Sequence, residues 1–113
     1  MQQQSDKTKK ALSLLGLAAR AGRAVIGVPL ICTALQRGAK DKTPCLVIEA
    51  ADSSANTHKR ITDRTAFYGV PTVRLEADCG ALALAVGKRD AAVAAVGVTE
   101  PHLAQAITDT LKE

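Results

Sequence analysis

Aromatic residues are scarce in this chain of 113 residues, which has one Phe, one Tyr and no Trp. RNA-binding modules that stack bases on a sheet or barrel surface need several exposed aromatic side chains. The scarcity therefore excludes base stacking of the kind that RRM and OB domains use. Apolar residues still make up 47% of the chain, most of them small or aliphatic, which is enough for one closely packed core and too little for two.

Cysteine is also infrequent, with Cys32, Cys45 and Cys79 widely spaced and odd in number. No C-x-x-C pair is present and no short ligand motif surrounds either histidine, so we expect no disulfide framework, no metal and no cofactor. No apolar run approaches the roughly 20 residues of a membrane span, and the polar N-terminus lacks a signal-peptide core. We therefore expect a cytoplasmic protein without a membrane partner.

Catalytic motifs are missing as well: there is no Walker loop, G-x-S-x-G elbow, H-E-x-x-H or G-x-G-x-x-G. Cys79 stands at a predicted helix N-terminus, where the pKa of a thiol can be lowered. Asp52 follows a predicted central strand, where α/β folds often bind ligands. Packing for Cys79 and a turn or helix cap for Asp52 are the stronger interpretations, so we expect no enzyme.

Charge of one sign is concentrated in the first half of the chain, although the net charge is only +4. Residues 1–64 hold 11 basic and five acidic side chains, whereas residues 65–113 hold four basic and six acidic ones. This asymmetry favours a polyanionic partner such as RNA. A mildly basic, merely solvated surface is the alternative interpretation.

Helical and strand patterns alternate along the chain, which is typical of an α/β fold. Helices are predicted over 6–21, 28–37, 55–68, 82–86 and 101–111, and strands over 23–26, 45–48, 71–75 and 91–98. In the third helix we expect Ile61, Thr65, Phe67 and Tyr68 to point inward. The predicted architecture is a three-layer α/β/α sandwich around a small mixed sheet of four or five strands, formed by one domain over 6–113 after a disordered tail, 1–5.

Basic residues flank the second predicted helix: Arg20 and Arg23 precede it, and Arg37, Lys40 and Lys42 follow it. Gly27 and Val28 form the N-terminus of this helix, where free N–H groups and the helix dipole favour phosphate. A second loop, Gly87-Lys88-Arg89-Asp90-Ala91, places two cations beside small residues. We expect these two segments to recognise a structured RNA by its backbone and shape.

Several short motifs make the chain resemble a known family. They are Leu15-Gly16-Leu17-Ala18-Ala19-Arg20-Ala21-Gly22-Arg23, then Gly27, Leu46-Val47-Ile48, Ala51-Asp52-Ser53-Ser54-Ala55-Asn56-Thr57, Tyr68-Gly69-Val70-Pro71 and Ala85-Val86-Gly87-Lys88. In this order, over about 9–107, they resemble the bacterial branch of the ribosomal L-seven-Ae/L-thirty-e family. The resemblance implies an α/β/α sandwich without catalytic activity that binds kink-turn RNA.

The segment that reads RNA in that family differs here. The family has a polar Asn-Glu or Glu-rich pair and then a Lys after the glycine, where this chain has Pro29, Leu30 and Thr33 behind Gly27. Side chains that would bond to base edges are missing, and each good bidentate contact is worth about 1–3 kcal/mol of discrimination. We therefore expect reduced base specificity. The resemblance also implies a second contact in the loop after the fourth helix, over 88–92.

The analysis of the residues and the resemblance together predict a non-catalytic RNA-binding protein, ribosomal or ribosome-associated, that binds structured, kink-turn-like RNA. The predicted RNA-binding residues are Arg20, Arg23, Gly27, Val28, Pro29, Leu30, Thr33, Arg37, Lys40, Lys88, Arg89, Asp90 and Ala91. The alternative is a diverged protein-interaction module that kept the fold and lost the RNA site. In that case the apolar run Val28-Pro29-Leu30-Ile31 would be the partner surface.

Overall fold

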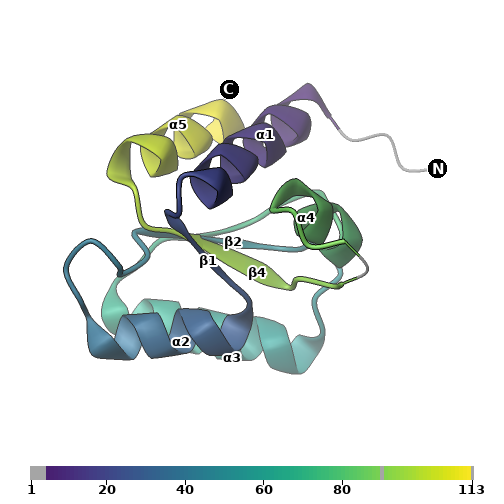
Figure 1. The fold of residues 1–113 in the computed structure, drawn as a ribbon. Helices are drawn as coiled ribbons and strands as arrows, with labels where there is room; N and C mark the ends of the chain where they lie inside the picture. The colour runs from purple at the N-terminus through teal and green to yellow at the C-terminus, as the bar shows by residue number, and fades with distance from the viewer. Residues whose placement is uncertain (1–4, 90, 113) are drawn as a thin grey trace.

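The structure is a computed structural model that describes residues 5–89 and 91–112 (Figure 1). Helices and strands alternate as the sequence predicts. Their bounds are α1 Asp6–Arg20, β1 Ala24–Ile26, α2 Val28–Arg37, β2 Leu46–Glu49, α3 Ala55–Tyr68, β3 Thr72–Arg74, α4 Cys79–Ala85, β4 Ala95–Val98 and α5 Pro101–Lys112. The predicted α/β class and the mixed sheet with four strands are both confirmed.

The four strands are arranged in the order β1-β4-β2-β3. Strand β4 is antiparallel to both of its neighbours, whereas β2 and β3 are parallel. Strands β2 and β4 are buried along their whole length, which explains why their sequences are nearly continuous apolar runs. Strand β1 lies at an edge of the sheet, as its short segment predicts.

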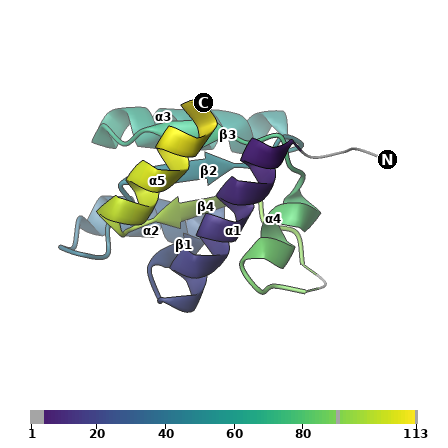
Figure 2. The ribbon, with the colours of Figure 1, turned by 90° about the horizontal axis from the view of Figure 1, so that it is seen from above.

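Helices cover both faces of the sheet and complete three layers (Figure 1). Helices α1, α4 and α5 lie on one face, with α1 between the other two (Figure 2), and α2 and α3 lie on the opposite face. Each face has its own apolar cluster: Leu15, Leu82 and Ile107 contribute to the first, and Ile31 and Ile61 to the second.

Helix caps in the structure agree with the sequence signals. Ser5, Ser54 and Asp78 each accept a hydrogen bond from a first-turn backbone N–H, at 3.2, 3.2 and 2.7 Å, as N-cap residues do. Gly38 and Gly69 end α2 and α3 in the left-handed conformation. These local signals explain why most helix bounds could be predicted to within a residue or two.

Phe67 is the clearest error in the predicted core, because 80% of its surface is exposed. Ile61, Thr65 and Tyr68 recur at the helical spacing and lie on the inner side of α3, with Ile61 and Thr65 fully buried. Phe67 is six residues from Ile61, a rotation of about 240°, and so faces water. Phe67 and Tyr68 are adjacent in the sequence but lie on different sides of the helix, because consecutive helical residues are rotated by about 100°.

Three other boundaries differ from the prediction. The strand expected over 91–98 begins only at Ala95, because its partners β1 and β2 end opposite Val96 and Ala95. Helix α4 begins three residues before the predicted 82, directly after its Asp78 cap. The predicted tail, 1–5, is one residue too long, because Ser5 is the N-cap of α1, the role that its position before Asp6 predicts. The rest of the predicted tail, 1–4, lies outside the described residues.

Candidate nucleic-acid interface

The junction between β1 and α2 is formed by Gly27, whose φ of 96° is a conformation that L side chains rarely adopt. Its N–H donates to Ala95 O at 3.0 Å, and its carbonyl accepts from Ile31 N–H at 3.0 Å. The first bond joins the start of α2 to the start of β4. Pro29 follows at the start of the helix, as predicted, and because it has no N–H this helix end offers one donor fewer to a phosphate.

The predicted apolar run at the start of α2 is divided between core and surface. Val28 and Ile31 are buried, at 8% and 2% exposure, and pack against Val47 and Ile61. Pro29 and Leu30 are exposed, Leu30 by 60%. The prediction of a continuous exposed apolar surface over these four residues is therefore wrong, because half of them follow the helical spacing of the core.

Thr33 and Arg37 continue the exposed side of α2 beyond Leu30. The Thr33 hydroxyl donates to Pro29 O at 3.0 Å, so its hydrogen is used within the helix. The Arg37 side chain is exposed, and no ion pair to it is found among the described residues. This side of α2 thus presents an apolar group, a hydroxyl oxygen and a cation in line.

The loop between α4 and β4 leads to the start of β4, which is joined to the start of α2 by the Gly27 hydrogen bond. Gly87 has a positive φ of 79°, and Lys88 N–H donates to Ala83 O at 2.8 Å. At its other end Val93 is buried and its N–H donates to Cys79 O at 3.2 Å. Both ends of the loop are thus held, while Lys88 and Ala91 are exposed. The structure brings together the two segments that the sequence analysis proposed as contacts.

A cleft of about 640 Å³ runs along the free edge of β1, a size typical of ligand-binding pockets. Ala24, Val25 and Ile26 form its strand side, and the exposed side of α2 forms the other. Three cations line it, and they come from three different segments: Arg37 from α2, Lys42 from the following loop, and Lys88. The full lining is Gly22, Ala24, Val25, Ile26, Leu30, Thr33, Ala34, Arg37, Ala39, Asp41, Lys42, Lys88 and Thr99.

Four predicted basic residues do not line this cleft. Arg20 lies in a separate groove between α1 and α4, beside Gly16 and Leu84. Arg23 is half-buried; its backbone N–H donates to Ala18 O at 2.8 Å, and its Nε is buried without a partner in the described part of the chain. Lys40 and Arg89 are exposed outside the cleft. Asp90 lies outside the described residues.

Three lining residues were not predicted from the sequence: Ala34, Asp41 and Thr99. Ala34 was detectable, since it is four residues from Leu30 and three from Arg37 on one side of a helix. Asp41 has a left-handed φ of 68° in the loop after α2, and nothing in the sequence indicates that this loop turns back toward β1. It is the one acidic side chain in the described lining.

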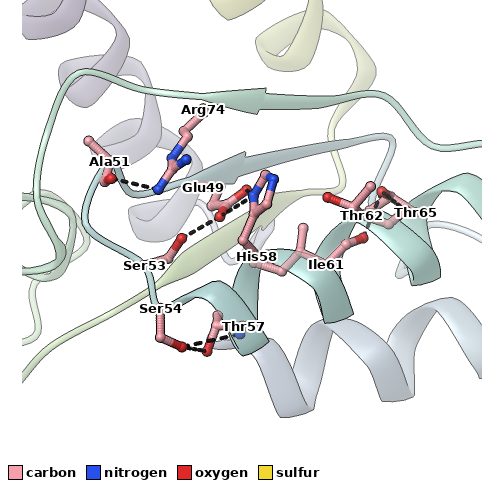
Figure 3. Close-up of polar contacts among 10 residues, drawn as sticks. All are labelled: Glu49, Ala51, Ser53, Ser54, Thr57, His58, Ile61, Thr62, Thr65 and Arg74. Atoms are coloured by element: carbon pink, nitrogen blue, oxygen red, sulfur yellow. Dashed lines mark hydrogen bonds and ion pairs between the residues drawn. The ribbon is translucent and has the colours of Figure 1, made fainter.

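A buried carboxylate lies at the end of β2, away from the cleft. Glu49 is 1% exposed and accepts hydrogen bonds from Ser53 Oγ and from His58 Nδ1, the latter at 2.9 Å (Figure 3). The serine donates to the carboxylate and not to the imidazole, so the three residues do not form a nucleophile and its base. This cluster fixes the turn that precedes α3.

Cys79 does not have the reactive thiol that its position at a helix end suggested. Burial first, and then the hydrogen bond and negative charge of Asp52, together raise the pKa of the Cys79 thiol to about 11. Asp52 in turn accepts the Cys79 backbone N–H at 2.8 Å, and hydrogen bonds from Cys79 lower the pKa of its carboxyl. The lowered pKa considered for Cys79 is therefore not found, in agreement with the packing role preferred for it, and the pair serves to hold the start of α4.

Within residues 5–89 and 91–112, no group of three or more His, Cys, Asp or Glu side chains is placed to hold a metal ion. None of the described helices has the length and apolar composition needed to cross a membrane.

Proteins of similar sequence carry a common name. The RNA-binding protein YlxQ of Bacillus subtilis (strain 168) is 39% identical over 83 residues, which cover 74% of this chain and 78% of that protein. The RNA-binding protein YlxQ of Enterococcus faecium is 39% identical over 67 residues, 59% of this chain. The match spans 61% of the Enterococcus protein's length. No protein-family model matches the chain.

Solved structures with the same fold extend over nearly the whole chain. A protein of unknown function from Bacillus halodurans superposes with a TM-score of 0.79 at 30% identity, covering 92% of this chain and 98% of that one. The 15.5kD RNA binding protein of Giardia lamblia superposes with a TM-score of 0.76, covering 97% of this chain and 88% of that one. Its 18% identity supports the fold alone.

Proposed function

The chain belongs to the family of the YlxQ RNA-binding proteins, within the ribosomal L-seven-Ae/L-thirty-e superfamily that its sequence resembles, and on this basis we propose that it is a non-catalytic RNA-binding protein. Its relatives with the higher identities are bacterial, which supports the bacterial branch. We propose that it acts in the cytoplasm on structured RNA of the kink-turn kind, with ribosomal RNA as one candidate.

One observation carries this proposal: the cleft along β1 joins the exposed side of α2 to Lys88. Three cations from separate segments, Arg37, Lys42 and Lys88, converge there, with Asp41 as the acidic residue of the lining. Convergent cations on a concave surface fit a bent phosphate backbone better than a straight duplex. The apolar Leu30 and the hydroxyl of Thr33 also line this surface and offer little to a base edge.

Binding in this proposal depends on phosphate contacts and on the shape of the RNA. Arg37, Lys42 and Lys88 bind phosphates in the cleft, and the exposed Lys40 and Arg89, which are neighbours of lining residues in the sequence, add to the positive charge outside it. Gly27 lets the backbone turn closely between β1 and α2. The protein-interaction alternative loses its support, because the apolar run on which it rested is half buried.

The test is binding to a kink-turn RNA and to a straight duplex of equal length, each at two salt concentrations. We expect tighter binding to the kink-turn RNA and a steep loss of affinity with salt. Equal, weak binding to both RNAs would remove the kink-turn proposal and leave nonspecific RNA binding. An unchanged affinity across the salt range would contradict the phosphate contacts themselves.

A further inference from the structure

Phe67, the one phenylalanine of the chain, lies in the last turn of α3 with 80% of its surface exposed. The rings of Phe67 and Tyr68 are in contact: their centroids are 4.9 Å apart and their planes make an angle of 77°. The edge of one ring thus meets the face of the other, an arrangement that aromatic pairs favour. A single exposed apolar side chain is ordinary on a protein surface, so the case for a site depends on the neighbours of Phe67.

Two arginines precede Phe67 at helical spacing. Arg64 is three residues before it and Arg60 seven residues before it, which places all three on one side of α3. Both arginines are exposed, and neither makes an ion pair or a side-chain hydrogen bond within the described residues. We call these three residues the α3 stripe.

The charge of the α3 stripe is not cancelled by its surroundings on the helix. The nearest acidic residue on α3, Asp63, is paired with Lys59 through a contact of 2.7 Å between Nζ and Oδ2. The stripe therefore keeps two free cations beside an aromatic ring, over a helix length of about 10 Å. A second copy of this chain would oppose arginines with arginines, so the charge favours an anionic partner.

Single-stranded RNA fits this combination. Proteins bind unpaired strands with cations that track the backbone and with aromatic rings on which bases stack. Stacked nucleotides rise about 3.4 Å each, so the stripe spans about three of them. Helices α2 and α3 lie side by side on one face of the sheet (Figure 1), so the helix that carries the stripe packs against the helix that forms one side of the cleft.

We propose that the α3 stripe is a second RNA contact, which binds a single-stranded segment flanking the structured RNA. One base stacks on Phe67, and Arg60 and Arg64 bind the phosphates next to it. This inference rests on the proposed function, because it assumes that structured RNA occupies the cleft. It also gives the chain a single base-stacking position, which differs from the platforms of several aromatic residues in RRM and OB domains.

The experiment compares one kink-turn RNA with and without a single-stranded extension of six nucleotides at either end. We expect an extension to tighten binding of the unaltered protein about 10-fold, a typical effect of stacking one base on an aromatic side chain. Phe67→Ala should abolish this gain, Phe67→Tyr should keep it, and neither should change binding to the RNA without extension. Because Phe67 is exposed, we expect both variants to fold, which circular dichroism checks.

The phosphate contacts have their own readout. The double variant Arg60→Ala with Arg64→Ala should reduce the slope of log affinity against log salt by about 1.4 for the extended RNA only. Lys9→Ala with Lys10→Ala is the matched control, since it removes the same charge from α1 on the opposite layer, and it should not remove the gain from the extension.

Tyr68 offers a local signal, because it is the one tyrosine of a chain without tryptophan. A short single-stranded oligonucleotide should quench its fluorescence after correction for base absorption, and Phe67→Ala should weaken this effect. If the structured RNA binds but the extension adds nothing, the inference is wrong while the proposed function stands. If the structured RNA does not bind, the proposed function fails. The quenching of Tyr68 fluorescence by the oligonucleotide then shows whether the α3 stripe binds single-stranded RNA independently. The inference would also be overturned if the unaltered protein bound anionic vesicles, Phe67→Ala lost that binding, and the RNA extension had no effect on either protein.

Discussion

The charge of the cleft along β1 makes a quantitative prediction. Arg37, Lys42 and Lys88 line it from three segments, and the proposed function has each of them neutralise one phosphate. The perturbation is the double variant Lys42→Ala with Lys88→Ala, which leaves Arg37 and Asp41 in place. Both lysines are exposed, so we expect the fold to be unaffected.

The magnitude follows from counterion release, which contributes about −0.9 to the slope of log affinity against log salt for each phosphate on a duplex. Three contacts give a slope of about −2.7, so the unaltered protein should lose about 40-fold in affinity between 50 and 200 mM salt. One remaining contact gives about −0.9, a loss of about 3.5-fold over the same range. The two slopes should therefore differ by about 1.8.

The assay is filter binding or fluorescence anisotropy with one kink-turn RNA at four salt concentrations. Lys7→Ala with Lys10→Ala is the control, because it removes the same charge from exposed positions of α1 that do not line the cleft. We expect the control to keep the slope of the unaltered protein. Equal slopes for the control and the cleft variant would refute the assignment of the phosphates to this cleft.

Three further predictions concern residues that the structure distinguishes. Ile31→Ala should lower the free energy of unfolding by about 2–5 kcal/mol, whereas Leu30→Ala, one residue away but exposed, should change it by less than about 0.5 kcal/mol; equal effects in urea denaturation would contradict the division of this run. Gly16→Ala should cost about 1–3 kcal/mol, because a Cβ there would lie 2.9 Å from a carbonyl oxygen of α4, and an unchanged melting temperature would show that α4 shifts freely. Cys79, with a thiol pKa of about 11, should be alkylated at pH 8 more slowly than a free thiol, and Asp52→Asn should speed the reaction because loss of the carboxylate lowers that pKa; a rate independent of Asp52 would contradict this coupling.

Most of the fold could be predicted from local patterns, because the signals are local in their physical origin. Ser5, Ser54 and Asp78 satisfy N–H groups within the next turn, and a glycine ends a helix where the backbone turns left-handed. Strand β2 is an apolar run bounded by polar turns. The start of β4 was harder, because it depends on where its partners β1 and β2 end.

The candidate site was predicted less well, because its residues converge from different segments. Arg20 and Arg23 were grouped with α2 because they precede it in the sequence. In the structure α1 and α2 lie on opposite faces of the sheet (Figure 1), so Arg20 at the end of α1 faces the groove beside α4. Lys42 and Lys88, far apart in the sequence, line the same cleft instead.

The sequence by itself determined the order and type of the elements, the family, and the positions where the polar readers of that family are replaced. These properties depend on hydrophobic periodicity, helix caps and residue identity, which are all set by residues close together in the sequence. Only the tertiary structure decided which cations share a cleft and that Phe67 faces water. Both depend on the packing of helices against a sheet, and a change of one residue along a helix, from Tyr68 to Phe67, is a rotation of about 100° that moves a side chain from the core side to the surface.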